Sequence, residues 1–214
     1  MLERLTWFRQ AAIRYMSDGL TLYVDPWGTE PDDPAADLIL ITHAHFDHLQ
    51  PHEIERLSTP GTKVVAPHDV ARELSGDVIA VAPGESYEVA GVRFETVPAY
   101  NVAEERLDMH PKANGWVGYL LELGGHRYYH GGDTDALPEL ESLSTDVAMV
   151  PIGGTFTMDY REAAGLVKVM RPKVAVPIHF GFVLCSPSHG ALFQREAAPV
   201  PVQILEPTNP FEQP

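Results

Sequence analysis

The stretch His43-Ala44-His45-Phe46-Asp47-His48 places three imidazoles and one carboxylate directly after the apolar run Leu38-Ile39-Leu40-Ile41-Thr42. Imidazole nitrogen and carboxylate oxygen are ligands that zinc, manganese and iron accept. The apolar run is typical of a buried strand, and a loop behind such a strand holds its side chains on a rigid scaffold. The sequence therefore predicts a metal site after residue 42. The alternative interpretation is a solvated, His-rich loop.

The rest of the chain alternates between short apolar runs and segments with helical spacing, without an obvious repeat or dividing linker. The runs bounded by Gly and Pro predict strands at 21–25, 38–42, 63–66, 78–82, 85–89, 92–97, 116–123, 126–129, 146–152 and 173–178. Apolar residues at helical spacing predict helices at 51–57, 69–74, 159–170 and 190–195.

The order of these elements predicts the fold class. Strands come first in hairpins and later alternate with helices, which is typical of a mixed α/β domain with sheets sandwiched between helices. We expect one such domain over residues 1–214. Residues 1–19 show no clear periodicity and stay unassigned. The proline-rich end from 199 to 214 is expected to run extended over the surface.

Composition and charge limit the classes of partner. The formal net charge of −15 repels a polyphosphate backbone, and Lys and Arg stand singly, so nucleic acid is not an expected partner. No apolar stretch approaches the roughly 20 residues of a membrane span, and the N-terminus lacks the pattern of a signal peptide. The lone Cys185 suits a reducing cytosol. We therefore expect a cytoplasmic protein, with no membrane partner, that acts on a small molecule; a homo-oligomer is left open.

Two later segments carry further potential ligands. Asp133 follows Gly131-Gly132, a pair that lets a strand turn sharply and bring a carboxylate close to a neighbouring group. His179 ends the apolar run 174–178, and the carboxyl end of a strand is a frequent site position in α/β sheets. Taken alone, Asp133 also fits a simple turn and His179 a buried core histidine.

The order of these motifs along the chain resembles the metallo-β-lactamase fold superfamily of metal-dependent hydrolases. H-x-H-x-D-H after a strand is followed by Gly-Asp-Thr at 132–134 and by the strand-terminal His179. The segments 128–134, 151–158 and 172–179 resemble the branch that includes ascorbate-6-phosphate lactonase and many uncharacterised hydrolases. The resemblance implies a four-layer αββα sandwich of the α/β (α+β) class, with two divalent metal ions at one edge of the sheets.

The resemblance also implies a role for each imidazole and carboxylate. It assigns His43 and His45 to the first metal, Asp47, His48 and His179 to the second, and Asp133 to both. Zinc and manganese are the expected ions, and iron and nickel suit the same ligands. Asp133 and Asp47 are the expected catalytic residues, the first by holding the two ions together and the second by positioning the nucleophile.

One ligand of the common pattern is missing. The first metal normally takes a third histidine from the loop after the strand 92–97, where this chain has Asn101. An asparagine oxygen suits these metals less well than imidazole. His110 is the only histidine in the same loop, so we expect it to replace the missing ligand. The alternatives are a surface position for His110 and a protein that works with one metal.

Several other side chains are expected near the site without binding metal. Asp25, at a strand end, is expected to orient a ligand histidine. The expected neighbours of the substrate are Asn101, His130, Ser186 and His189. A buried strand histidine is the alternative for His130, and a polar loop is the alternative for the last two.

The expected chemistry is hydrolysis. Two cations that share a water lower its pKa towards neutrality, and the resulting hydroxide attacks a carbonyl or phosphoryl centre. The main hypothesis is therefore a hydrolase of a small lactone, ester or phosphodiester. An iron-dependent redox enzyme of the same fold is the alternative; the resemblance argues only against the di-iron oxygen reductases, which typically have an acid at the position of His45. A non-catalytic member is favoured by Asn101 and disfavoured by the remaining clustered ligands.

Overall fold

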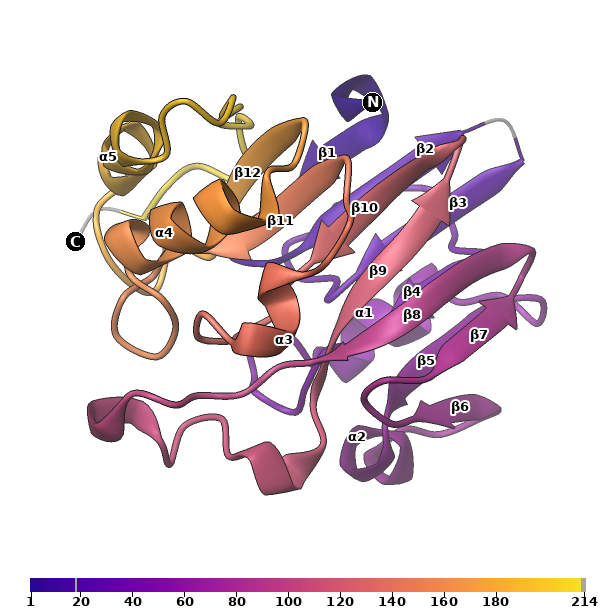
Figure 1. Cartoon of the computed structure of the whole chain (residues 1–214). Helices are drawn as coiled ribbons and strands as arrows, with labels where there is room; N and C mark the ends of the chain where they lie inside the picture. Colours follow the sequence, from indigo (N-terminus) through magenta and orange to yellow (C-terminus); the bar gives the residue numbers. More distant parts are fainter. Residues whose placement is uncertain (18, 213–214) are drawn as a thin grey trace.

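The computed structural model describes residues 1–17 and 19–212, which fold into two six-stranded sheets packed face to face (Figure 1). The first sheet has the order β1-β2-β3-β4-β5-β6, with bounds Leu5–Trp7, Ile13–Ser17, Leu20–Val24, Leu38–Leu40, Lys63–Pro67 and Val78–Val81. The second has the order β12-β11-β10-β9-β8-β7, and in chain order β7 to β12 span Ser86–Val89, Val92–Pro98, Val117–Leu123, His126–His130, Val147–Pro151 and Val174–Ile178.

Helices cover the outer faces of both sheets. The helices α1 (Pro51–Leu57) and α2 (His68–Glu73) pack on the first sheet, and α4 (Tyr160–Met170) and α5 (His189–Glu196) lie over the second (Figure 1). The short α3 (Pro138–Glu141) connects β10 to β11. The structure thereby confirms the predicted αββα sandwich.

Alternation along each strand decides which layer a side chain enters. In β3, Leu22 and Val24 belong to the core between the sheets, whereas Tyr23 packs with the layer of α1 and α2. In β4, Leu38 faces the central core and Ile39 the helical layer. Successive strand residues point to opposite faces, so a strand buried on both faces must be apolar at every position.

The predicted strands and helices all form, with ends shifted by a few residues. Asp159 caps α4: its carboxylate accepts from the backbone N–H of Arg161 and Glu162, and the Glu162 side chain accepts from the Asp159 N–H. The unassigned N-terminal segment forms β1 and β2; β1 pairs antiparallel with β2, and β2 pairs antiparallel with β3. The helix α3 was not predicted.

The C-terminal segment runs extended as predicted, as far as the described residues reach. Val202 forms an isolated bridge with Ala175 of β12, and Pro207 forms one with Trp7 of β1. Residues 213 and 214, which belong to the same prediction, lie outside the described residues. None of the helices in the described part of the chain has the length and apolar character that crossing a bilayer requires. The single domain over 1–214 stays a prediction.

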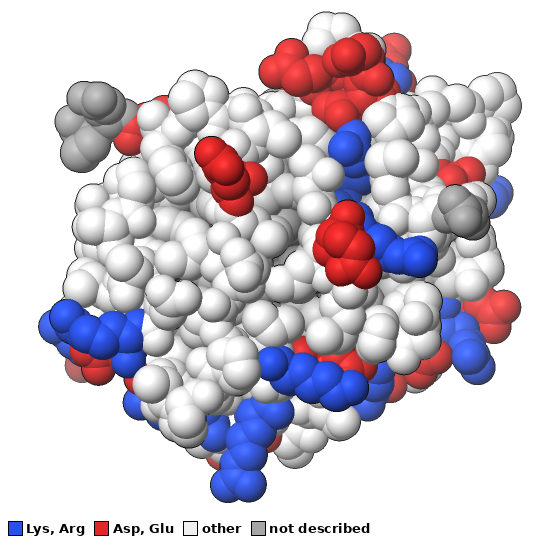
Figure 2. Space-filling view, turned by 90° about the horizontal axis from the view of Figure 1, so that it is seen from above, with Lys and Arg blue, Asp and Glu red and all other residues white. Residues whose placement is uncertain are grey.

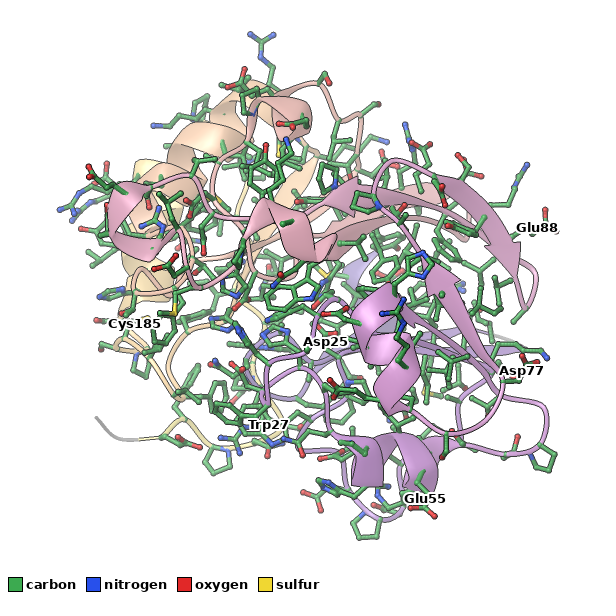
Figure 3. The ribbon with its side chains drawn as sticks, turned by 90° about the horizontal axis from the view of Figure 1, so that it is seen from below. Asp25, Trp27, Glu55, Asp77, Glu88 and Cys185 are labelled. Carbon is green, nitrogen blue, oxygen red and sulfur yellow. The ribbon has the colours of Figure 1, made fainter. Side chains whose placement is uncertain are left out.

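The loops that carry the predicted site residues leave the sandwich at one edge. Strands β3 and β4 run parallel in the first sheet, and β10, β11 and β12 run parallel in the second, so their carboxyl ends lie together within each sheet. Thr42 of the first sheet and Gly132 of the second approach so closely that a Cβ on Gly132 would lie 2.9 Å from the Thr42 Cβ. Figure 3 looks at the molecule from this side, with Asp25 near its centre.

Candidate metal centre

Four side chains form a first group of potential ligand atoms. One atom from each lies within 4.8 Å of every other, and the four residues are His43, His45, His110 and Asp133. The His43 Nε2 lies 3.1 Å from His45 Nδ1 and 3.9 Å from Asp133 Oδ2, and the His110 Nε2 lies 3.3 Å from the same oxygen. His45 is half-buried and the other three are buried.

A second group lies beside the first and shares its carboxylate. Asp47, His48 and His179 each bring one ligand atom within 4.8 Å of the other two. The His179 Nε2 lies 3.2 Å from Asp47 Oδ2 and 3.2 Å from Asp133 Oδ2. The His48 Nε2 lies 3.4 Å from Asp133 Oδ1. Asp133 therefore stands between histidines of both groups.

Outer hydrogen bonds orient three of the imidazole rings. The Nδ1 of His48 lies 2.7 Å from Asp25 Oδ2, that of His110 lies 2.8 Å from Asn101 Oδ1, and that of His43 lies 3.0 Å from the Thr42 hydroxyl oxygen. A histidine that donates from Nδ1 to such an oxygen keeps the lone pair on Nε2 for a metal. These hydrogen bonds therefore fix which ring nitrogen carries the proton as well as where each ring lies.

The inward-facing atoms of the two groups fit divalent metal ions. The Nε2 atoms of His48 and His110 and the Oδ1 of Asp133 are buried without a hydrogen-bond partner among the described residues. A buried polar atom without a partner is costly, and here such atoms converge on one place. Imidazole nitrogens and carboxylate oxygens are the donor set that zinc and other transition metals prefer.

Asp25 lies where the sequence placed it, behind a ligand histidine. Its backbone has φ +47°, a left-handed conformation that is uncommon outside glycine. In this conformation the carboxylate accepts from the Thr42 N–H and the Thr42 hydroxyl, both at 2.7 Å, and from His48. The strained residue ties β3 to the start of the ligand loop.

His110 takes the position expected for the missing third histidine. Asn101 lies behind it, and its Nδ2 donates to Asp135 Oδ1 at 3.0 Å and to the Phe156 carbonyl at 3.1 Å. Asn101 is buried and faces His110 and Asp135, and it does not line the cavity beside the two groups, so its place as a neighbour of the substrate stays a prediction. Its side-chain oxygen accepts a hydrogen bond from the His110 Nδ1–H and thereby orients the ring.

The loop that carries His110 is anchored by an ion-pair network that the sequence did not reveal. Asp135 accepts from the N–H groups of Val102 and Ala103 and, at 2.6 Å, from the Arg106 Nε. Arg106 is buried and also donates twice to Glu162 in the first turn of α4. These bonds hold the loop to the second sheet, which keeps His110 in place.

Gln10, from the turn between β1 and β2, is a site residue that sequence reasoning missed. Its Nε2 lies 3.0 Å from Asp47 Oδ2 and 3.2 Å from His179 Nε2. Its carbonyl accepts from the His179 N–H and the Trp7 indole, both at 2.8 Å. The residue lies in the segment without periodicity, and only the tertiary fold brings it to the second group.

The other three expected neighbours of the substrate, His130, Ser186 and His189, contact other parts of the fold, and their role toward a substrate stays a prediction. His130 is buried, with Nε2 2.8 Å from the Ala11 carbonyl and Nδ1 accepting from the Gly132 N–H, so its ring supports the backbone. Burial lowers its pKa. Ser186 forms hydrogen bonds with Ser188, and His189 packs edge-on against Tyr160. None of the three lines the cavity beside the two groups.

Charges of opposite sign dominate the second group. Burial opposes the charged form of His48, yet the carboxylates of Asp133 and Asp47 raise its pKa well above the usual range. The same two carboxylates overcome burial and raise the pKa of His179 to about 9. Conversely, and against the effect of burial, these imidazoles hold the pKa of Asp133 well below its usual range and lower that of Asp47.

The first group is more nearly neutral. Burial lowers the pKa of His43 well below its ordinary value, and the neighbouring His48 adds to this effect. Burial also lowers the pKa of His45, with His110 acting in the same direction. Neutral imidazole is the form that binds a metal.

Replacing Asn101 by alanine tests the orientation of His110. We expect the affinity of the first group for zinc to fall by about 10- to 100-fold, because the ring loses its Nδ1 acceptor. A titration against a competing chelator measures this change. Asn114→Ala, an exposed asparagine in the same loop, is the control and should bind zinc like the parent protein. Equal affinities for both variants would contradict the assigned role.

Comparisons with known proteins agree with this geometry. The family model described as "Beta-lactamase superfamily domain" matches residues 4–179. The chain belongs to this superfamily. A UPF0173 metal-dependent hydrolase from Methanopyrus kandleri is 32% identical over an alignment that covers 98% of this chain and 100% of that protein. The chain is thus a member of the UPF0173 metal-dependent hydrolases within the superfamily.

Solved structures share the fold of this hydrolase family member. A protein from Parabacteroides distasonis, described as a metal-dependent hydrolase, has a TM-score of 0.87 and 28% identity, covering 95% of this chain and 93% of its own. Igni18, a metallo hydrolase from Ignicoccus hospitalis, has a TM-score of 0.74 and 26% identity, covering 95% and 94%. The superfamily and the fold predicted from the sequence are confirmed. The ascorbate-6-phosphate lactonase branch stays a prediction.

Proposed function

We propose that this UPF0173 family member hydrolyses a small lactone, ester or phosphodiester at a centre of two divalent metal ions. The observation that carries the proposal is the position of Asp133, whose two oxygens lie within 4 Å of imidazoles from both ligand groups. A carboxylate between two sets of inward-facing imidazoles is the arrangement that a pair of cations requires. Zinc or manganese suits these ligands, as do iron and nickel.

Each residue has a distinct task in this proposal. His43, His45 and His110 would hold the first ion and Asp47, His48 and His179 the second, and Asp133 stands between the two groups. The ions supply a water of lowered pKa and polarise the bond that is cleaved.

The two acids of the cavity are the catalytic residues of the proposal. Asp47 and Asp133 both line the cavity, so they are placed to accept hydrogen bonds from the attacking water and orient it. The hydrogen bond from Gln10 Nε2 to Asp47 Oδ2 holds the Asp47 carboxylate in this orientation.

The charge distribution supports a small-molecule substrate for this proposal rather than nucleic acid. The net charge is −15. Figure 2, the view from above, shows Lys and Arg singly or beside Asp and Glu, with no continuous basic track on that face. A nucleic-acid partner needs such a track. We infer a cytoplasmic location from the single cysteine.

Metal content per chain tests the proposal most directly. Elemental analysis of protein isolated without added metal or chelator should give close to two equivalents of zinc or manganese. Removal with a chelator should abolish ester hydrolysis, and the same ion should restore it. One equivalent would mean that one of the ligand groups is incomplete. Iron would favour the redox alternative, and no metal after reconstitution would refute the hydrolase proposal.

A further inference from the structure

The cavity beside the two ligand groups has an apolar wall. It encloses about 200 Å³ and is lined by His45, Phe46, Asp47, Met109, Asp133, Phe156, Val183 and Leu184. The polar lining residues are the ligand residues His45, Asp47 and Asp133, and the other five are large hydrophobic residues. None of the eight is lysine or arginine. The cavity therefore offers a reactive end and an apolar end.

Exposed apolar side chains extend this wall outward. Phe46 is 63% exposed, Val183 41% and Met109 40%. Val102 and Leu107, on the loop that carries His110, are also exposed. Among the described residues only two further large hydrophobic side chains are exposed, so three of the seven line the cavity and two more lie on the loop of His110. Apolar side chains concentrated around a concave site are typical of a ligand-binding surface.

Nearby cations are engaged elsewhere and do not face the cavity. Arg106 is buried in its pairs with Asp135 and Glu162. Arg9 lies over the Trp27 ring at 3.9 Å and pairs with Glu212. A charged phosphate or carboxylate group on the substrate, away from the bond that is cleaved, would thus meet apolar side chains. It would lose hydration without gaining a partner. An alkyl or aryl group would gain from the same contacts.

We propose that the substrate is an uncharged carboxylic ester or lactone with an apolar acyl or alkyl group, which rests on the hydrolase function proposed above. The scissile carbonyl lies at the end of the cavity formed by His45, Asp47 and Asp133. The apolar group lies against Met109, Phe156 and Val183. This assignment excludes sugar phosphates and nucleotides as preferred substrates, because a charged group away from the metal centre would meet no lysine or arginine in the lining.

The reaction consumes one water. Its oxygen bonds to the carbonyl carbon, and the bond from that carbon to the alcohol oxygen breaks. The alcohol oxygen takes a proton, and the other product is a carboxylate with release of one proton. In a lactone the two products remain one hydroxy acid. No oxidant or further reactant is needed.

Chain-length dependence tests the assignment. With the metal-loaded protein, kcat/KM for p-nitrophenyl acetate, butyrate and hexanoate should rise by about two- to fourfold for each added methylene, because each buries apolar area. Bis(p-nitrophenyl) phosphate should be hydrolysed more slowly than any of the three. No rise along the series, or faster cleavage of the phosphodiester, would overturn the assignment while leaving the hydrolase function intact.

Variants of the apolar wall separate its role from that of the metal centre. Met109→Gln and Val183→Ser should flatten the chain-length dependence, because kcat/KM falls more for the hexanoate than for the acetate. Val169→Ser changes an exposed side chain on α4 and should keep the full dependence. An unchanged slope in both wall variants would refute the role of these side chains.

Product binding gives a readout that does not depend on turnover. Calorimetric titration of the metal-loaded protein should give at least tenfold tighter binding of hexanoate than of acetate. Both wall variants should narrow this ratio. Equal affinities would contradict the apolar subsite. Failure of the proposed hydrolase function would look different. The protein would then cleave no ester in a metal-dependent way, while hexanoate would still bind more tightly than acetate.

Discussion

Replacing Asp133 by asparagine is expected to lower kcat/KM for ester hydrolysis by about a hundred- to a thousandfold. Asp133 is buried, and its two oxygens face imidazoles of both ligand groups. Asparagine keeps the size of the side chain but removes the negative charge that two neighbouring cations need between them. The metal content should therefore fall from two equivalents to one or less, measured by elemental analysis beside the kinetics.

A matched substitution separates this effect from a general loss of charge. Asp108→Asn changes an exposed acid on the loop of His110 and should keep both metal equivalents and the parent activity. Circular dichroism of both variants checks that the sandwich is intact. If the Asp133 variant keeps two equivalents, the carboxylate does not join the two ions and the proposed centre is wrong.

Replacing Asp25 by alanine is expected to lower the free energy of unfolding by about 3–5 kcal/mol in the metal-free protein. The carboxylate is fully buried and accepts hydrogen bonds from the Thr42 N–H, the Thr42 hydroxyl and His48. Its loss leaves these donors without a partner in the interior. Urea unfolding followed by tryptophan fluorescence measures the change.

Two companion variants show whether Asp25 also acts on the metal. Asp37→Ala removes an exposed carboxylate that accepts from the Thr21 N–H, and it should cost about 1 kcal/mol or less. Asp25→Asn still accepts from the Thr42 N–H through its amide oxygen, but its amide nitrogen cannot accept a hydrogen bond from the His48 Nδ1–H. The isosteric variant should fold and yet bind the second ion about 10- to 100-fold more weakly. Parent-like affinity in the folded Asn variant would remove Asp25 from the metal centre.

Much of the candidate site followed from the sequence because its residues occur in local patterns. The run from His43 to His48 supplies four potential ligands on one loop, so local spacing suffices to bring them together. Asp133 and His179 stand at strand ends, where parallel strands carry side chains to a common edge. Even the replacement of the missing histidine by His110 followed from its being the only histidine in that loop.

Other features of the site depend on contacts between distant segments. Gln10 reaches Asp47 and His179 across 37 and 169 positions of the chain. Asn101 looked like a defective ligand or a pocket residue, and only its contacts with His110 and Asp135 show that it orients a ring. A single sequence does not encode which of several polar loop residues will face one another, because loop conformation follows from packing of the whole fold.

The same division holds for the fold. By itself the sequence determined the sandwich class, the strands and the helices other than α3 from residue 20 onward, and the ligand loop after β4, because apolar periodicity and Gly or Pro boundaries act within a few residues. Tertiary structure alone decided β1 and β2, the ion pairs that hold the His110 loop, and the apolar wall from Phe46 to Val183. These features arise where segments far apart in the chain meet, and their free energy comes from contacts that local spacing does not contain.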